Sequence, residues 1–257
     1  MVELKKCLWC LKTVSETTFD KKAHTIPKSL GGQNFNQNVC DECNYYFGNR
    51  ECHNGNYSIE VALKEAFNLS RRMFLNSGGS KRKVGDFKSQ FFELKERKGK
   101  YRLIIKDSFR FTKGFQEELC RAFKRGLLKM YLEELNRQTG EGFEGKFNSI
   151  REFARYNKND IPVFYFYRKL GIIMMIKSEA ETPILYFGKM KYLISNDKFC
   201  EIEFLGHVFG FPIADASMKD YENHVVESVL AKKEYFSNAG VISKLTDIDL
   251  TMKVFND

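Results

Sequence analysis

The chain has 257 residues, of which 43% are hydrophobic and 14% are aromatic, and it contains only 4 prolines. This composition is typical of a globular protein and excludes an intrinsically disordered or collagen-like chain. The formal net charge is +9, and no run of about 18 apolar residues is present, so we expect no transmembrane helix and no membrane partner.

The N-terminal segment and the cysteines indicate the expected compartment. Residues 1–20 lack the basic, apolar and small-residue order of a secretory signal, so we expect a cytoplasmic protein. Four of the seven cysteines form two Cys-x-x-Cys pairs near the N-terminus. In a protein that is not secreted, this pattern favours a bound metal over disulfides.

Residues 1–56 are expected to form a first, small domain. They are rich in Cys, Asn and Gly, so we expect a loop-and-hairpin unit that needs a structural metal to fold. The pairs are Cys7-Leu-Trp-Cys10 and Cys40-Asp-Glu-Cys43. Four thiolates with this spacing predict a closed tetrahedral Zn²⁺ site, with Cys52 and His53 as spare ligands.

The segment between the pairs reads Ala23-His-Thr-Ile-Pro-Lys-Ser-Leu-Gly-Gly32, and the second pair continues as Cys43-Asn-Tyr-Tyr-Phe-Gly48. Together these motifs resemble the HNH endonucleases of the ββα-metal class, in the subgroup with two Cys-x-x-Cys zinc knuckles. The close resemblance covers residues 7–48, less than a fifth of the chain. It implies a ββα-metal module that hydrolyses nucleic-acid phosphodiesters, in which structural zinc joins the hairpin to the helix.

The resemblance implies catalytic roles for His24, Asn38 and Asn44. His24 corresponds to the general base, and a neutral imidazole can take a proton from water near pH 7. Asn38 is expected to orient the hairpin or the His24 ring. Asn44 is expected to bind a catalytic Mg²⁺ or Mn²⁺ ion, which would neutralise charge on the phosphate.

Ala23 departs from the pattern of the family. In many HNH sites the residue before the base is acidic or histidine and ligates the metal, which a methyl group cannot do. Glu51 and His53 are the substitute ligands that we consider first. Alternatively, the metal is held weakly by Asn44, water and the substrate phosphate, or catalysis has been lost while DNA binding is retained.

Residues 57–110 are expected to form a helix, a basic linker and a strand pair. Apolar residues recur at helical spacing from Ile59 to Phe74, and two strands over 87–111 meet at a turn near Lys98-Gly99-Lys100. Between Arg71 and Arg102, 11 Lys or Arg stand against 3 Asp or Glu. This local excess favours a polyanionic partner over a solvated face.

Residues 111–257 are expected to form an α+β domain of unassigned fold that serves recognition, partner binding or sensing. A helix is predicted from Thr112 to Arg137, a shorter one over Ser149–Tyr156, and a final one over Met218–Phe236. Strands are expected between Ile161 and Pro212. His207 is expected in the core and His224 on the surface.

Nine basic side chains are predicted to contact nucleic acid. Three of them step by four along the long helix, about 200° from its apolar stripe, so we expect them to face outward. The nine are Lys28, Arg71, Arg72, Lys81, Arg82, Lys83, Arg121, Arg125 and Lys129.

The sequence therefore predicts an α+β protein that is a metal-dependent endonuclease, with double-stranded DNA as its expected substrate. Restriction or antiphage defence is the setting that we consider. Two alternatives stay open, namely a catalytically silent zinc-module DNA-binding protein and a nuclease that acts on structured RNA. A homodimer or a protein partner through the C-terminal region is also left open.

Overall fold

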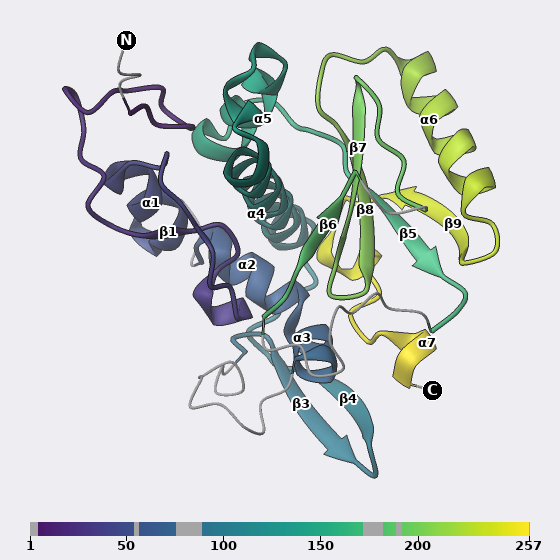
Figure 1. The fold of residues 1–257 in the computed structure, drawn as a ribbon. Coiled ribbons are helices and arrows are strands. Elements are labelled where there is room, and N and C mark those ends of the chain that lie inside the picture. Colours follow the sequence, from purple (N-terminus) through teal and green to yellow (C-terminus); the bar gives the residue numbers. More distant parts are fainter. Residues whose placement is uncertain (1–4, 54–56, 76–88, 172–181, 189–191, 257) are drawn as a thin grey trace.

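The computed structural model describes residues 5–53, 57–75, 89–171, 182–188 and 192–256 (Figure 1). Helices and strands both contribute, which confirms the α+β class. The predicted contact residues Lys81, Arg82 and Lys83 lie outside the described residues.

The N-terminal module is a short strand pair followed by a helix. Its elements are β1 (Ala23–His24), the 3-10 turn η1 (Lys28–Leu30), β2 (Phe35–Asn36), α1 (Asp41–Gly48) and the 3-10 turn η2 (Arg50–Cys52). Glycines allow the turn between the antiparallel strands, because Gly31 has a φ of +92° and a Cβ at Gly32 would lie 1.9 Å from the carbonyl oxygen of Ile26. The chain therefore folds back tightly after β1.

Two short helices and a hairpin follow the module. They are α2 (Ile59–Ala66), α3 (Asn68–Phe74), β3 (Phe92–Arg97) and β4 (Lys100–Ile105). The prediction of one continuous helix is wrong, because the helix breaks at Phe67, whose buried ring packs against Phe123 and Phe209. The predicted strand pair is confirmed, with its turn at Lys98-Gly99.

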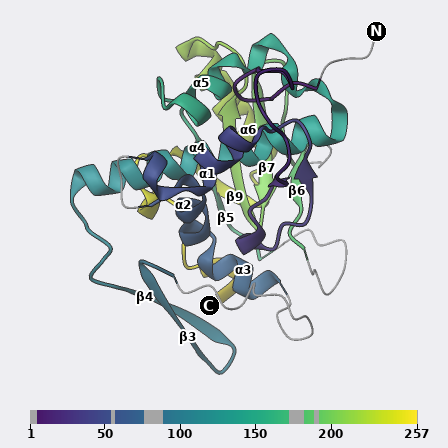
Figure 2. The same cartoon turned by 90° about the vertical axis from the view of Figure 1, so that its left-hand side faces the viewer.

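The helix α4 (Lys113–Thr139) runs through the centre of the molecule. Figures 1 and 2 show it between the N-terminal elements and the C-terminal sheet. The prediction that its basic stripe faces outward is wrong, since Arg125 is 5% exposed and Lys129 is 1% exposed. Because α2, α5 and β2 all pack against α4, the side opposite its apolar stripe is covered as well.

The C-terminal region contains a five-stranded sheet. Its elements are η3 (Glu141–Phe143), η4 (Gly145–Phe147), α5 (Asn148–Tyr156), β5 (Phe164–Arg168), β6 (Leu185–Phe187), β7 (Phe199–Phe204), β8 (His207–Pro212), α6 (Met218–Ala231), β9 (Phe236–Val241), η5 (Leu245–Asp247) and α7 (Lys253–Asn256). The strand order is β6-β7-β8-β5-β9, with antiparallel neighbours. The helix predicted over Met218–Phe236 is shorter than predicted, because α6 ends at Ala231, and the strand β9 was not predicted.

The sheet lies between two helices (Figure 1). Tyr131 of α4 packs edge-on against Phe211 at 5.0 Å between ring centroids, whereas Tyr221 of α6 lies 6.1 Å from Phe164. Strands β7 and β8 are buried along their whole length because helices cover both faces. Part of the helix α6 is therefore buried too, and the prediction of a surface His224 is wrong because this side chain is 2% exposed.

One hydrophobic core connects the module to the rest of the chain. It extends from the first cysteine pair through α2 and α4 to the sheet and to the segment around Ile248. Within the described ranges, no helix is both long and apolar enough to cross a membrane.

Candidate functional site

Four cysteines of the module gather around one point. The Sγ atoms of Cys7, Cys10, Cys40 and Cys43 all lie within 4.8 Å of one another, and those of Cys10 and Cys40 are 3.7 Å apart. A tetrahedral zinc ion with bonds of about 2.3 Å separates its sulfur ligands by about 3.8 Å. The donor set therefore fits a closed structural zinc site, as the spacing predicts.

Hydrogen bonds from the protein support these thiols. The amide of Cys40 donates to Cys7 Sγ at 3.4 Å, and the amide of Cys43 donates to Cys40 Sγ at 3.5 Å. From α5, Arg155 Nε donates to Cys43 Sγ at 3.3 Å. These donors offset part of the negative charge that four thiolates bring to a zinc ion.

His24 stands on β1 and is half-buried. Burial lowers the pKa of His24 below its ordinary value, and the positive charges of Lys28 and Lys129 lower it further. A hydrogen bond with the backbone of Lys22 acts in the opposite direction, and so does, to a smaller extent, the carboxylate of Glu60 in the first turn of α2. The ring is therefore mostly neutral at pH 7, the form that can accept a proton.

A buried chain of hydrogen bonds holds the backbone of His24. Lys129 Nζ donates to the His24 carbonyl oxygen at 2.9 Å and to a carboxylate oxygen of Glu133, also at 2.9 Å. Trp9 Nε1, from the first cysteine pair, donates to the other oxygen of Glu133 at 2.8 Å. The strand of His24 and the cysteine cluster are thus joined through one turn of α4.

The two asparagines of the predicted site lie in different surroundings. Asn38 is half-buried, and its side chain donates to the Lys6 carbonyl oxygen at 3.3 Å and accepts from Asn136 at 3.4 Å. These contacts fit the expected role of orienting the hairpin. Asn44 is half-buried in α1, where its backbone amide donates to the Cys40 carbonyl oxygen at 2.9 Å.

The predicted substitute ligands contact tyrosines of α1. His53 shares a hydrogen bond of 2.9 Å with the Tyr46 carbonyl oxygen, and Glu51 accepts one of 3.4 Å from the Tyr45 hydroxyl. Neither is among the charged groups that act most on His24. Ala23 is fully buried, so its methyl group faces protein.

The predicted nucleic-acid contacts divide by exposure. Lys28 and Arg72 are exposed, which suits contact with a polyanion. Arg121 is partly exposed and pairs with Asp160 at 3.3 Å.

For three other basic residues the prediction is wrong, because their charged groups bind protein atoms inside the fold. Arg71 donates to the Ser29 carbonyl oxygen at 3.1 Å, and Arg125 donates to carbonyl oxygens of α5. Lys129 takes part in the chain that reaches His24.

Sequence reasoning missed Glu60 and Glu133. The i,i+4 spacing of Lys129 and Glu133 could have indicated an ion pair. No local signal relates Glu60 to His24, because α2 reaches β1 only through the tertiary fold.

Comparison with known proteins gives one result for the module. Residues 7–52 match the family model of the HNH endonucleases. No curated protein and no solved structure matches the chain. The match covers both cysteine pairs and His24, and it supports a nuclease activity with a nucleic-acid substrate for this part of the chain.

Proposed function

We propose that this protein is a metal-dependent endonuclease that hydrolyses DNA phosphodiester bonds, with His24 as the general base. The observation that carries the proposal is the HNH match over residues 7–52, whose cysteines converge on one zinc-sized point beside the strand of His24. The zinc-binding cysteines are buried or half-buried, so we give zinc a structural role and not a catalytic one.

The chemistry follows from the state of the imidazole. Neutral His24 takes a proton from a water molecule, whose oxygen forms a bond to phosphorus while the bond to the leaving oxygen breaks. The leaving oxygen then takes up a proton from solvent. Asn38 acts through the hairpin, because its side chain joins the Lys6 carbonyl oxygen, next to the first cysteine pair, to Asn136 of α4.

A divalent ion, Mg²⁺ or Mn²⁺, would neutralise the charge that develops on the phosphate. The described residues offer few ligands, since the cysteine cluster is their only group of three or more metal-binding side chains. This suits Mg²⁺, which is commonly held by one or two carboxylates together with water and substrate phosphate. We propose Asn44 and Glu60 as the side chains that would hold the ion.

Double-stranded DNA is the substrate that we propose, and Lys28 supports it as an exposed cation four residues after His24. A role in restriction or antiphage defence belongs to the same proposal, as does location in the cytoplasm. The C-terminal region would serve recognition, self-association or binding of a protein partner. Loss of catalysis with retained DNA binding, and cleavage of structured RNA, are the alternatives that the experiment must separate.

The test is cleavage of supercoiled plasmid and of structured RNA in Mg²⁺, Mn²⁺ or chelator. We expect nicked or linear plasmid with the parent, and none with His24→Ala, although zinc content and DNA binding are retained. The matched control is Gln37→Ala, at an exposed position beside β2, which should cut like the parent. Cleavage by His24→Ala would refute the base, and binding without cleavage by the parent would favour the silent module.

A further inference from the structure

The hairpin β3–β4 has two faces of different chemistry. Its strands pair antiparallel in register, so directly opposite residues point to the same side. One face, the inner face, carries the pairs Phe92–Ile105, Leu94–Leu103 and Glu96–Tyr101. The other, the basic ribbon face, carries Glu93–Ile104, Lys95–Arg102 and Arg97–Lys100.

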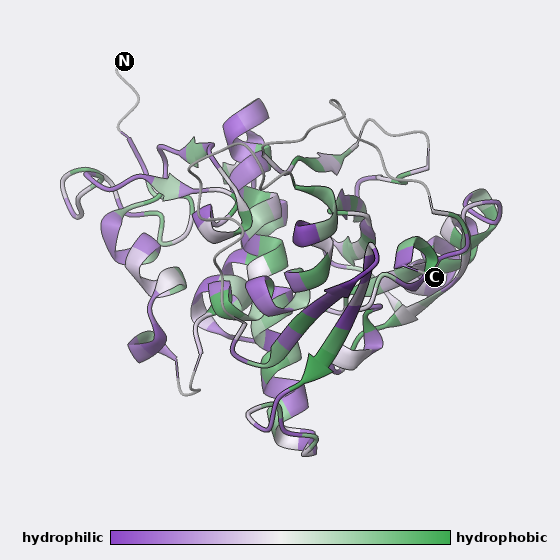
Figure 3. Cartoon of the chain, turned by 90° about the horizontal axis from the view of Figure 1, so that it is seen from below, coloured by the Kyte–Doolittle hydropathy of each residue, from purple (hydrophilic) through white to green (hydrophobic). Residues whose placement is uncertain are grey.

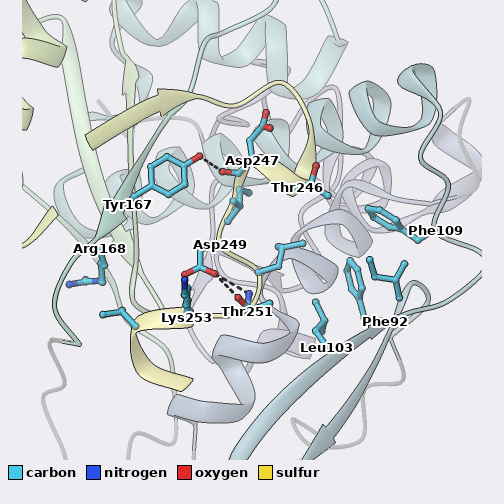
Figure 4. A pocket seen from close by; sticks show the side chains of 14 residues that line it. Phe92, Leu103, Phe109, Tyr167, Arg168, Thr246, Asp247, Asp249, Thr251 and Lys253 are labelled. Carbon is cyan, nitrogen blue, oxygen red and sulfur yellow. Dashed lines mark hydrogen bonds between the residues drawn. The ribbon is translucent and has the colours of Figure 1, made fainter. Parts of the chain in front are cut away.

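The inner face is held against the body of the protein. Phe92 and Leu103 line a cavity of about 690 Å³, whose opposite wall includes Asp249 and Thr251 (Figure 4). Near the tip, the backbone amide of Tyr101 donates to the side chain of Asn256, which donates back to the Tyr101 carbonyl oxygen. The hairpin therefore has a defined orientation, and its basic ribbon face points away from the cavity.

The basic ribbon face is exposed and positively charged. Figure 3 shows hydrophilic residues toward the tip of the hairpin and hydrophobic ones at its base. The exposed cations are Lys95, Arg97, Lys100 and Arg102, and Lys98 adds a fifth at the turn.

The turn fixes where these charges stand. Lys98 and Gly99 have φ angles of +55° and +76°, which the two-residue turn of a tight hairpin requires. The turn thus brings strand ends of like charge close together.

The arrangement of the charges works against the stability of the free hairpin. Lys95 stands directly opposite Arg102, and Arg97 stands directly opposite Lys100. Like charges in opposite cross-strand positions repel each other and destabilise a hairpin. Glu93 offsets part of this charge, with 3.6 Å between its carboxylate and Lys95 Nζ. A polyanion bound to this face would relieve the repulsion that remains.

Helix α3 connects the hairpin to the proposed catalytic loop. Arg71 donates to the Ser29 carbonyl oxygen, beside exposed Lys28. The charge of its neighbour Arg72 acts on the pKa of Tyr101, on the hairpin. Figures 1 and 2 both show α3 between η1 and the hairpin. Exposed Lys28 therefore lies where α3 contacts the loop after His24, and exposed Arg72 lies where α3 comes near the hairpin.

We propose that the basic ribbon face binds the phosphate backbone of duplex DNA while the HNH module acts on it, so the inference rests on the proposed function. A two-stranded ribbon fits the major groove of B-form DNA, whereas the major groove of A-form RNA is too narrow for side chains to enter. The contacts are electrostatic, so they hold the duplex without selecting its sequence.

The experiment compares two variants that carry the same change in charge. The ribbon variant replaces Lys95, Arg97, Lys100 and Arg102 by Gln. The control replaces four exposed lysines of the C-terminal region by Gln, and these are Lys158, Lys219, Lys233 and Lys244. Binding to a fluorescent DNA duplex is measured by anisotropy without added Mg²⁺ or Mn²⁺, between about 50 and 200 mM salt. A duplex RNA of the same length is the second probe, and zinc content and circular dichroism confirm folding.

We expect the ribbon variant to bind DNA more weakly, with a log–log salt slope reduced by about 0.9 per lost contact and by up to about 3.6 in all. The control should keep the parental slope to within about 0.9. An unchanged slope in the ribbon variant overturns the inference, and so does an equal loss in the control or stronger parental binding to RNA.

Cleavage by His24 is scored separately, which keeps the two proposals distinguishable. If the parent cuts plasmid and the ribbon variant keeps the parental salt slope of DNA binding, only the role of the basic ribbon face is refuted. A parent that binds DNA through the ribbon but never cuts refutes only the proposed function.

Discussion

His24 shows how the surroundings of one side chain set its chemistry. The imidazole is half-buried, and two lysines, Lys28 and Lys129, add positive charge around it. Both effects disfavour the protonated ring, and the hydrogen bond with the Lys22 backbone and the charge of Glu60 oppose them only in part. The imidazole of His24 consequently stays neutral to a lower pH than the imidazole of a solvated histidine.

This state predicts the pH dependence of cleavage. A lowered pKa means that His24 stays neutral to a lower pH, so the acid limb of the rate profile should have its midpoint below about 6.5. Glu60→Gln removes the charge that raises this pKa, so the midpoint should move to still lower pH. The measurement is the single-turnover rate from pH 5 to 8 at saturating metal.

If Glu60 holds the ion as proposed, Glu60→Gln should also raise the concentration of Mg²⁺ needed for half-maximal rate, because a carboxylate ligand is lost. Glu51→Gln is the informative comparison. If Glu51→Gln raises the concentration of Mg²⁺ required and Glu60→Gln does not, Glu51 is the substitute ligand, as the sequence analysis expects, and Glu60 does not bind the metal.

Single residues also show what the sequence could and could not predict. The four cysteines follow from spacing alone, because ligands of a closed zinc site must converge. The burial of Arg125 and Lys129 could not be predicted from the sequence. A helix position opposite an apolar stripe is solvated only when nothing else packs against it. Here the module packs there, and it is held by the same two side chains.

At the scale of elements, α4 supplies the hydrogen-bonded turn beneath β1. Lys129 and Glu133 are almost completely buried, so each charge depends on the other. Removing one partner of a buried pair costs about 3–5 kcal/mol, because the remaining charge is left without compensation. Replacing both by neutral residues costs far less.

We therefore expect Lys129→Met to lower the free energy of unfolding by about 3–5 kcal/mol and to reduce cleavage, since β1 loses its support. The double variant Lys129→Met, Glu133→Gln should recover most of the stability but less of the cleavage, because the bond to the His24 carbonyl oxygen is still missing. Urea denaturation and plasmid assays measure the two quantities. Equal destabilisation of the single and double variants would contradict this account of the pair.

Periodicity predicts whether most elements are helices or strands, but it does not predict where the helices α2 and α6 end. The break at Phe67 has no local signal in the sequence, and the Phe67 ring lies in tertiary contacts with α4 and the sheet. Similarly, the helix α6 ends before the buried Lys232, whose ammonium lies 2.5 Å from a Glu201 oxygen. Both helix ends thus lie at residues with tertiary contacts, which the periodicity of the sequence does not describe.

At the scale of the whole molecule, the zinc module is part of the main core. Arg155 contacts a zinc-binding cysteine, and Arg151 donates to the Leu8 carbonyl oxygen at 2.9 Å, both from α5. A small domain of this kind could have been an independent unit, as the boundary at residue 56 predicts. The shared core instead indicates that loss of zinc affects the rest of the chain.

Zinc removal should therefore destabilise the protein as a unit. We expect chelation, or Cys40→Ser, to lower the melting temperature in a single calorimetric transition and to expose core amides of α4 to hydrogen exchange. Cys52→Ser is the matched control, because this half-buried cysteine lies outside the cluster. Two separate transitions, with α4 still protected, would show that the module unfolds alone.

Trp9 gives this coupling an optical signal. It is the only tryptophan of the chain, and its buried indole lies edge-on to Phe47 and bonds to Glu133. Fluorescence excited selectively in the indole therefore originates from one point, the joint between the first zinc knuckle and α4. Separation of the knuckle from α4 would bring water to the ring and shift its emission to longer wavelength. The protein thus contains its own intrinsic fluorophore for following docking of the module in solution, without a label.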